Sequence, residues 1–118
     1  MESTELAKLS QDLIEGKKGN DVVLLNISEM SSFADYFVNA TATNIRQLAT
    51  IMDEVEKGLT AAGDPPRGIE GRPESGWVLI DAGDVIVNLF LEAEREKYQI
   101  EKIWKDAVTS AVTHGDNE

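Results

Sequence analysis

Trp77-Val-Leu-Ile-Asp81-Ala-Gly83-Asp84-Val-Ile-Val-Asn-Leu-Phe90 is the stretch of sequence that decides the fold class of this chain. Two apolar runs, each rich in β-branched residues, flank a short acidic segment. Gly83 lies inside that segment and can adopt the positive φ that tight hairpins need. We therefore predict a β-hairpin over residues 77–90, and the other elements are assigned outward from it.

Three further strands are predicted before the hairpin. The run Val22–Ile27 is apolar except for Asn26, which is typical of a strand that is covered on both faces. Aromatic and β-branched residues predict a second strand from about Tyr36 to Thr41. Residues 69–71 are predicted as a short strand before a loop from Arg72 to Gly76. The doubly covered strand predicts helices on both sides of a sheet.

Two amphipathic helices are predicted in the N-terminal half. The first follows Ser3, a suitable N-cap, and ends near Gly16 and Gly19. The second follows Asn44 and Gln47, which resemble a capping box, and ends near Gly63. The apolar face of the first helix contains Leu6, Leu9, Leu13 and Ile14, and that of the second contains Ile45, Leu48, Met52, Val55 and Leu59.

The C-terminal part is predicted to be helical. Residues 92–97 are charged and favour a helical turn, and an apolar stripe then predicts a closing helix. Residues 113–118 are expected to form a frayed polar tail. The apolar stripe of the closing helix consists of Ile100, Ile103, Trp104, Ala107, Val108 and Ala111.

The predicted order of elements is therefore α-β-β-α-β-β-β-α. With 118 residues and 42% hydrophobic residues, the chain has the size of one domain with one core. We predict a single α/β domain over residues 1–112, with a mixed sheet of about five strands and helices on both faces.

The charge and residue content exclude several classes of function. The chain has 22 acidic and 11 basic residues and a net charge of -11, so its field repels a phosphate backbone, and free nucleic acid is not an expected ligand. A basic partner is favoured, although acidity can also serve solubility alone. The absence of cysteine, of a secretory leader pattern and of a membrane-length apolar run predicts a cytoplasmic protein.

The acidic hairpin is the only candidate for catalysis that the sequence offers. Asp81 and Asp84 could together hold a divalent cation, but aspartate is equally common in turns, where it bonds to backbone amides. Neither a phosphate-binding glycine-rich loop nor a suitably placed basic residue accompanies them. His114 lies in the predicted tail, and no serine has the context of a nucleophile. We therefore predict no catalytic residue, no metal and no cofactor.

Trp77 has two possible roles, because tryptophan is frequent both in cores and at interfaces. On a strand face with Leu79, Asp81 and Asp84, Trp77 would combine an aromatic anchor with two negative charges and no expected cation nearby. That combination suits docking on a basic protein. The alternative, that Trp77 fills the core, stays open at this point. Trp104 belongs to an apolar helical stripe and favours core or oligomer contacts.

Most of the chain carries a pattern that resembles the ribosomal silencing factors, also called Iojap-like proteins. An earlier segment, Ala34-Asp-Tyr-Phe-Val38, is similar to a first signature of that family. The resemblance departs at Asn88, where the family usually has histidine, and at Ala42, where a glycine is usual. The more specific signature comprises Glu70-Gly71, Trp77–Asp81, Gly83–Val87, Phe90, Arg95, Tyr98, Glu101, Trp104 and Asp106-Ala107.

The resemblance implies a function that composition alone does not indicate. Members of this family bind the fourteenth large-subunit protein, in universal ribosomal naming, on the face of the large ribosomal subunit where the small subunit joins. They thereby block subunit association and repress translation. The resemblance also implies a nucleotidyltransferase-like fold without catalytic apparatus and a homodimer when the protein is free. It makes Trp77, Asp81 and Asp84 the first candidates for partner contact, followed by Glu70, Leu79, Arg95 and Tyr98.

Two alternatives from other classes remain beside this hypothesis. One is a magnesium-dependent, nucleotidyltransferase-like enzyme that uses Asp81 and Asp84. The other is a dimeric adaptor with a partner outside the ribosome.

Overall fold

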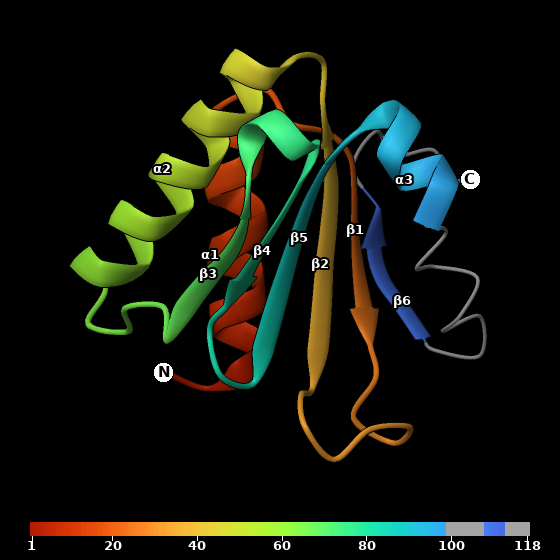
Figure 1. Cartoon of the computed structure of the whole chain (residues 1–118). Coiled ribbons are helices and arrows are strands. Elements are labelled where there is room, and N and C mark those ends of the chain that lie inside the picture. The colour runs from red at the N-terminus through yellow and green to blue at the C-terminus, as the bar shows by residue number, and fades with distance from the viewer. Residues whose placement is uncertain (99–107, 113–118) are drawn as a thin grey trace.

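A mixed β-sheet forms the centre of the structure, which is a computed structural model that describes residues 1–98 and the backbone of residues 108–112 (Figure 1). The elements in chain order are α1 (Ser3–Gly16), β1 (Asn20–Asn26), β2 (Tyr36–Ala42), α2 (Ile45–Ala61), β3 (Gly68–Arg72), the 3-10 turn η1 (Pro73–Ser75), β4 (Trp77–Asp81), β5 (Val85–Leu91), α3 (Glu92–Tyr98) and β6 (Val108–Val112).

The strand order of the described sheet is β3-β4-β5-β2-β1-β6. Strands β2 and β5 are parallel, and the other neighbouring pairs are antiparallel. The predicted hairpin is confirmed, because β4 and β5 pair from Trp77 opposite Phe90 to Asp81 opposite Ile86. Gly83 in its turn has a φ of +87°. The predicted α/β class, the single domain and the mixed sheet are confirmed as well.

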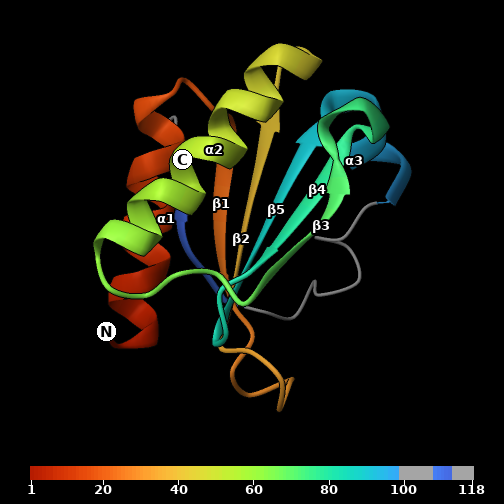
Figure 2. The ribbon, with the colours of Figure 1, turned by 60° about the vertical axis from the view of Figure 1, so that its left-hand side comes forward.

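Helices α1 and α2 pack side by side on one face of the sheet (Figures 1 and 2). Side chains alternate between the two faces of a strand, so each strand contributes to both layers. In β1, Leu24 belongs to the core under α1 and α2, whereas the adjacent Leu25 belongs to a smaller cluster on the opposite face with Phe37 and Ile86. The prediction that this strand is covered on both faces is therefore confirmed.

Helix α3 lies on that opposite face (Figure 2). Its Arg95 donates from Nη1 to the carbonyl oxygen of Asp21 and to Oγ1 of Thr41, each at 2.8 Å. These bonds connect α3 to the start of β1 and to the end of β2. The expectation of helices on both faces is confirmed.

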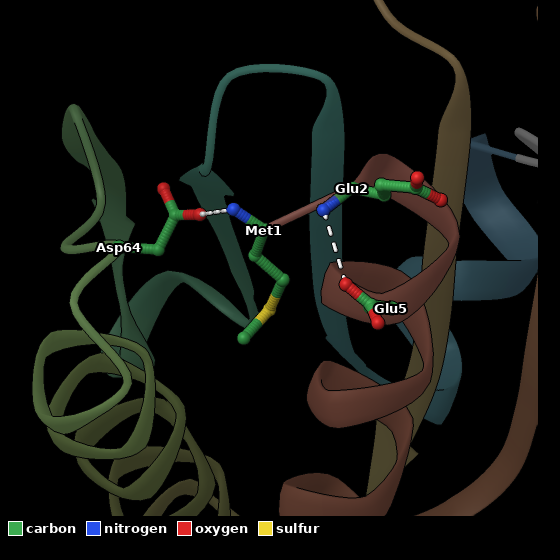
Figure 3. Close-up of polar contacts among 4 residues, drawn as sticks. All are labelled: Met1, Glu2, Glu5 and Asp64. Carbon is green, nitrogen blue, oxygen red and sulfur yellow. Dashed lines mark hydrogen bonds and ion pairs between the residues drawn. The ribbon is translucent and has the colours of Figure 1, made fainter.

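The start of α1 differs from the prediction. The N-cap is Glu2, and Ser3 is the first helical residue. The amide of Glu2 donates to Oε1 of Glu5 at 3.3 Å, and the amino nitrogen of Met1 lies 3.8 Å from Oδ2 of Asp64, in the loop after α2 (Figure 3). A carboxylate in the first turn thus meets an amide that the helix itself leaves unpaired, so the helix does not need serine at the cap.

Helix α2 begins as predicted, with Oδ1 of Asn44 accepting from the amide of Gln47 at 2.8 Å. The predicted apolar face is wrong at Ile45, which is 44% exposed, while Ile51 is fully buried. Both isoleucines have helical spacing to Leu48, so periodicity could not tell them apart. The buried face of the helix consists of Leu48, Ile51, Val55 and Leu59.

The predicted closing helix is wrong over its last residues. Residues 108–112 form β6, which pairs with β1 from Asn26 opposite Val108 to Val23 opposite Val112. Three of these five residues, Val108, Thr109 and Val112, are β-branched, and β6 covers an edge of β1 that would otherwise be open. Residues 99–107, with Trp104, and the predicted tail at 113–118 lie outside the described residues. No helix in the described part of the chain is long and apolar enough to cross a membrane.

Candidate functional site

Trp77 begins β4 on the sheet face that α1 and α2 leave uncovered. Its ring stacks on Phe90 of the neighbouring strand, with 5.2 Å between ring centroids, and meets Tyr98 at the end of α3, with 4.4 Å between centroids. Gly76 before it has a φ of +83°, and its carbonyl oxygen accepts from the amide of Leu91 at 2.9 Å. The turn into β4 and the rings beside it together fix the place of Trp77.

A chain of two buried amides holds the inner edge of the Trp77 ring. Its Nε1 donates to Oδ1 of Asn88 at 3.0 Å, and Nδ2 of Asn88 donates to Oδ1 of Asn39, also at 3.0 Å. Asn39 and Asn88 lie directly opposite each other on β2 and β5 and are 0% and 1% exposed. Buried amides of this kind need partners, so the chain fixes the orientation of the indole.

Trp77 is therefore neither a simple core residue nor a free surface residue. It is half-buried, with its polar edge bonded inside the sheet and part of its ring facing a cavity. The core interpretation therefore describes part of its surroundings, and a role of Trp77 in partner contact stays a prediction.

A cavity of about 270 Å³ lies beside Trp77. Glu70 lies opposite Leu79 in the pairing of β3 and β4, and Tyr98 comes from the end of α3. The structure thus brings Glu70, Trp77, Leu79 and Tyr98 to one place, although up to 28 positions separate them in the sequence. The described residues that line the cavity are Glu70, Gly71, Ser75, Trp77, Leu79 and Tyr98.

Asp81 and Asp84 lie at the other end of the hairpin. A strand advances about 3.4 Å per residue, so Asp81 is about 14 Å along β4 from Trp77. Its Oδ1 accepts from the amide of Gly83 at 2.9 Å, which is the turn-forming role of aspartate. The side chain of Asp84 is exposed, while its carbonyl oxygen accepts from the amides of Asp35 and Tyr36.

The expectation that no cation lies near these aspartates is wrong. The guanidinium of Arg67 lies so close to Gly83 that a Cβ added there would be 3.4 Å from Nε and Nη2 of Arg67. The amide of Arg67 donates to the carbonyl oxygen of Asp81 at 2.7 Å, just before β3. Arg67 is separated from the hairpin turn by 14 positions or more, so its position depends on the pairing of β3 with β4.

Arg95 is not among the described lining residues of the cavity. Its two hydrogen bonds to Asp21 and Thr41 give it a structural role, because they hold α3 against the ends of two strands. Arg95 therefore contributes to the site indirectly, by placing the helix that ends in Tyr98.

Sequence reasoning missed Asn39 as part of the site and noted Asn88 only as a departure from the family pattern. Each is a polar residue inside a strand that is otherwise largely apolar, and this was the available signal. Their pairing depends on the parallel contact between β2 and β5, which the sequence does not indicate. In the described part of the chain, no group of three or more His, Asp or Glu side chains is arranged to hold a metal ion.

Comparisons with known proteins agree with the resemblance in the sequence. A family model described as "Ribosomal silencing factor during starvation" matches residues 1–118. A ribosomal silencing factor of Halalkalibacterium halodurans is 37% identical over 109 residues, which are 92% of this chain and 93% of that protein.

Two further similarities extend this comparison. The crystal structure of a Chromobacterium violaceum protein superimposes with a TM-score of 0.86 at 34% identity and covers 96% of this chain and 93% of that one. The mouse protein named mitochondrial assembly of ribosomal large subunit protein 1 is 28% identical over 95 residues, which are 78% of this chain and 42% of that protein.

Proposed function

This chain belongs to the ribosomal silencing factor family, and on that premise we propose that it binds the large ribosomal subunit and sterically blocks the joining of the small subunit. The docking partner is a basic protein on the subunit interface, the fourteenth large-subunit protein in universal ribosomal naming. The protein then represses translation in the cytoplasm without a chemical step.

The observation that carries this proposal is the aromatic cavity at Trp77. Interfaces are enriched in tryptophan, tyrosine and arginine, and a few such anchors in preformed pockets supply most of the binding energy. Trp77 has a fixed ring orientation before any partner arrives, because Asn88 and Phe90 hold it. Less ordering entropy is therefore lost when the partner binds.

The charge of the chain supports a basic partner. The net charge is -11, and Asp84 exposes a carboxylate on the same hairpin. Exposed charges at an interface mainly steer the encounter and set its rate, whereas the desolvated centre sets the lifetime of the complex. The acidic turn and the aromatic cavity would then have different roles in one docking event.

A magnesium-dependent enzyme has less support. The hydrogen bond from the amide of Gly83 occupies Oδ1 of Asp81, and Arg67 lies against the turn between the two aspartates. A nucleotide with magnesium that bound the native state would raise the melting temperature by mass action. We expect no such rise with any common nucleotide, and a rise abolished by Asp81→Asn would support the enzyme.

Sedimentation with purified ribosomal subunits tests the proposal. Wild-type protein at low salt should pellet with large subunits in a saturable manner and should not pellet with small subunits. Protein that stays in the supernatant with both subunits would contradict the proposal, and equal pelleting with both would indicate unspecific adhesion.

The homodimer expected for the free protein stays a prediction. Sedimentation velocity of the isolated chain checks it.

A further inference from the structure

We propose that the cavity beside Trp77 accepts the guanidinium group of one arginine side chain on the partner protein. The inference rests on the proposed function, and it adds the chemical identity of the group that fills the cavity. Three properties of the cavity support it: its aromatic walls, its carboxylate and its size.

The aromatic walls form a corner that suits a planar cation. The rings of Trp77 and Tyr98 have centroids 4.4 Å apart and are inclined by 45°. A cation over an aromatic face is attracted by the ring quadrupole, most strongly over tryptophan, and guanidinium also stacks on such faces. The Tyr98 ring already attracts a cation of this chain, since Nζ of Lys97 lies 5.5 Å from its centroid.

Glu70 supplies a negative charge at the same cavity. It lies on β3, next to the strand that carries Trp77, and its side chain is exposed. Within residues 1–98 and 108–112, no hydrogen bond or ion pair is formed by its carboxylate. A carboxylate can accept two parallel hydrogen bonds from guanidinium, whereas lysine offers a strongly hydrated point charge. The combination therefore favours arginine over lysine.

The size of the cavity favours a side chain over a metabolite. Its volume of about 270 Å³ lies below the roughly 300–1,000 Å³ of small-molecule sites. Leu79 adds an apolar wall along which the methylene groups of an arginine can pack while the charged end reaches Glu70. A net charge of -11 raises the local concentration of any basic partner segment.

A small probe tests the recognition directly on the intact protein. N-acetyl-arginine amide and the neutral, nearly isosteric N-acetyl-citrulline amide are titrated while the indole N–H resonance of Trp77 is followed by NMR. That resonance is assigned by its loss in Trp77→Phe. We expect a saturable shift with the arginine probe and only a small shift with the citrulline probe, and the arginine shift should weaken severalfold in Glu70→Gln. Equal responses to the two probes, or none to either, would overturn the inference.

The second part of the test measures binding to large subunits. Glu70→Gln keeps the shape of the side chain and should weaken binding about 5- to 30-fold, as expected for a lost charge-assisted bond and a weakened cation site. The matched control, Glu74→Gln, removes the same charge from the adjacent exposed turn, outside the described cavity lining, and should change binding less than about twofold.

The two parts of the test separate this inference from the proposed function. Wild-type protein that does not bind large subunits contradicts the proposed function. Wild-type binding that Glu70→Gln leaves unchanged contradicts only the arginine inference. Well-dispersed NMR spectra of both glutamine variants show that the fold is intact.

Discussion

The two ends of the β4–β5 hairpin differ in how firmly the fold holds them and in what they offer to a partner. At the Trp77 end, stacking and a chain of buried amides fix an aromatic ring beside a cavity. At the Asp81–Asp84 end, one carboxylate forms the turn, the other is exposed, and the Arg67 side chain lies against Gly83 between them. One hairpin therefore combines an apolar anchor with a charged surface, and these should affect affinity and association rate separately.

The largest expected effect is at the anchor. Trp77→Ala removes the ring that faces the cavity, and truncating an interface hot spot costs about 2 kcal/mol or more, or roughly 30-fold in the dissociation constant for large subunits. Pelleting titrations measure this loss. Phe33→Ala is the control, because Phe33 is an aromatic residue that is 59% exposed away from the cavity. Similar losses in both variants would remove the special role of the Trp77 end.

The backbone beside the cavity should tolerate no side chain at Gly71. This residue has a φ of +84°, and an added Cβ would lie 2.3 Å from the carbonyl oxygen of Trp77. Gly71→Ala should lower the free energy of unfolding by about 1–3 kcal/mol, as measured by urea denaturation. Gly68→Ala on the same strand meets no atom within 4 Å and should stay within about 0.5 kcal/mol of wild type. Equal stability of the two variants would contradict the described β3–β4 register.

The amide chain should be needed to orient Trp77. Asn88→Leu leaves the buried indole N–H without its acceptor, which costs about 1–3 kcal/mol of stability, and the Trp77 indole resonance should move and broaden. Binding to large subunits should weaken less than in Trp77→Ala. Asn88→His keeps one acceptor and one donor. Above the pKa of its imidazole, this variant should therefore recover much of the stability and of the indole resonance position that Asn88→Leu loses. An unchanged indole resonance in Asn88→Leu would show that stacking alone orients the ring.

The smallest effect is expected at the charged end. Asp84→Lys should slow association with large subunits severalfold at low salt, and the difference should shrink as salt screens the charges. The dissociation rate should stay nearly constant. Biolayer interferometry with surface-immobilised subunits measures both rates. The control is Glu56→Lys, which makes the same charge change on α2, over the opposite face of the sheet. A change confined to dissociation would reverse the roles assigned to the two ends.

Local patterns in the sequence were enough to predict most elements. The hairpin, β1, β2 and the N-cap of α2 at Asn44 each follow from a few consecutive residues, because turn chemistry, alternation and capping are local. The predictions that failed concern residues whose structure depends on contacts far away in the sequence. Strand β6 resembled a helix, since Val108 and Ala111 also suit a helical stripe, and its pairing with the distant β1 decides the outcome.

The candidate site likewise combines residues that local patterns indicate with contacts that depend on distant parts of the chain. The hairpin pattern indicated Trp77, Leu79, Asp81 and Asp84, and the resemblance added Glu70, Arg95 and Tyr98. The meeting of Glu70, Trp77, Leu79 and Tyr98 at one cavity depends on strand register and on the position of α3, neither of which the sequence indicates. Asn39 was missed because a polar residue in a strand has no evident role until its partner on β5 is known. Arg67 was missed because its place beside the hairpin turn depends on the pairing of β3 with β4.

Subunit joining tests the central claim most directly. Small and large ribosomal subunits are mixed with magnesium, and their association is followed by light scattering with wild-type protein, Trp77→Ala or Phe33→Ala at equal concentration. The proposed mechanism predicts that wild-type protein and Phe33→Ala suppress association, while Trp77→Ala does so only at much higher concentration. Wild-type protein that pellets with large subunits but leaves their association unchanged, or a Trp77→Ala variant as effective as wild type, would contradict it.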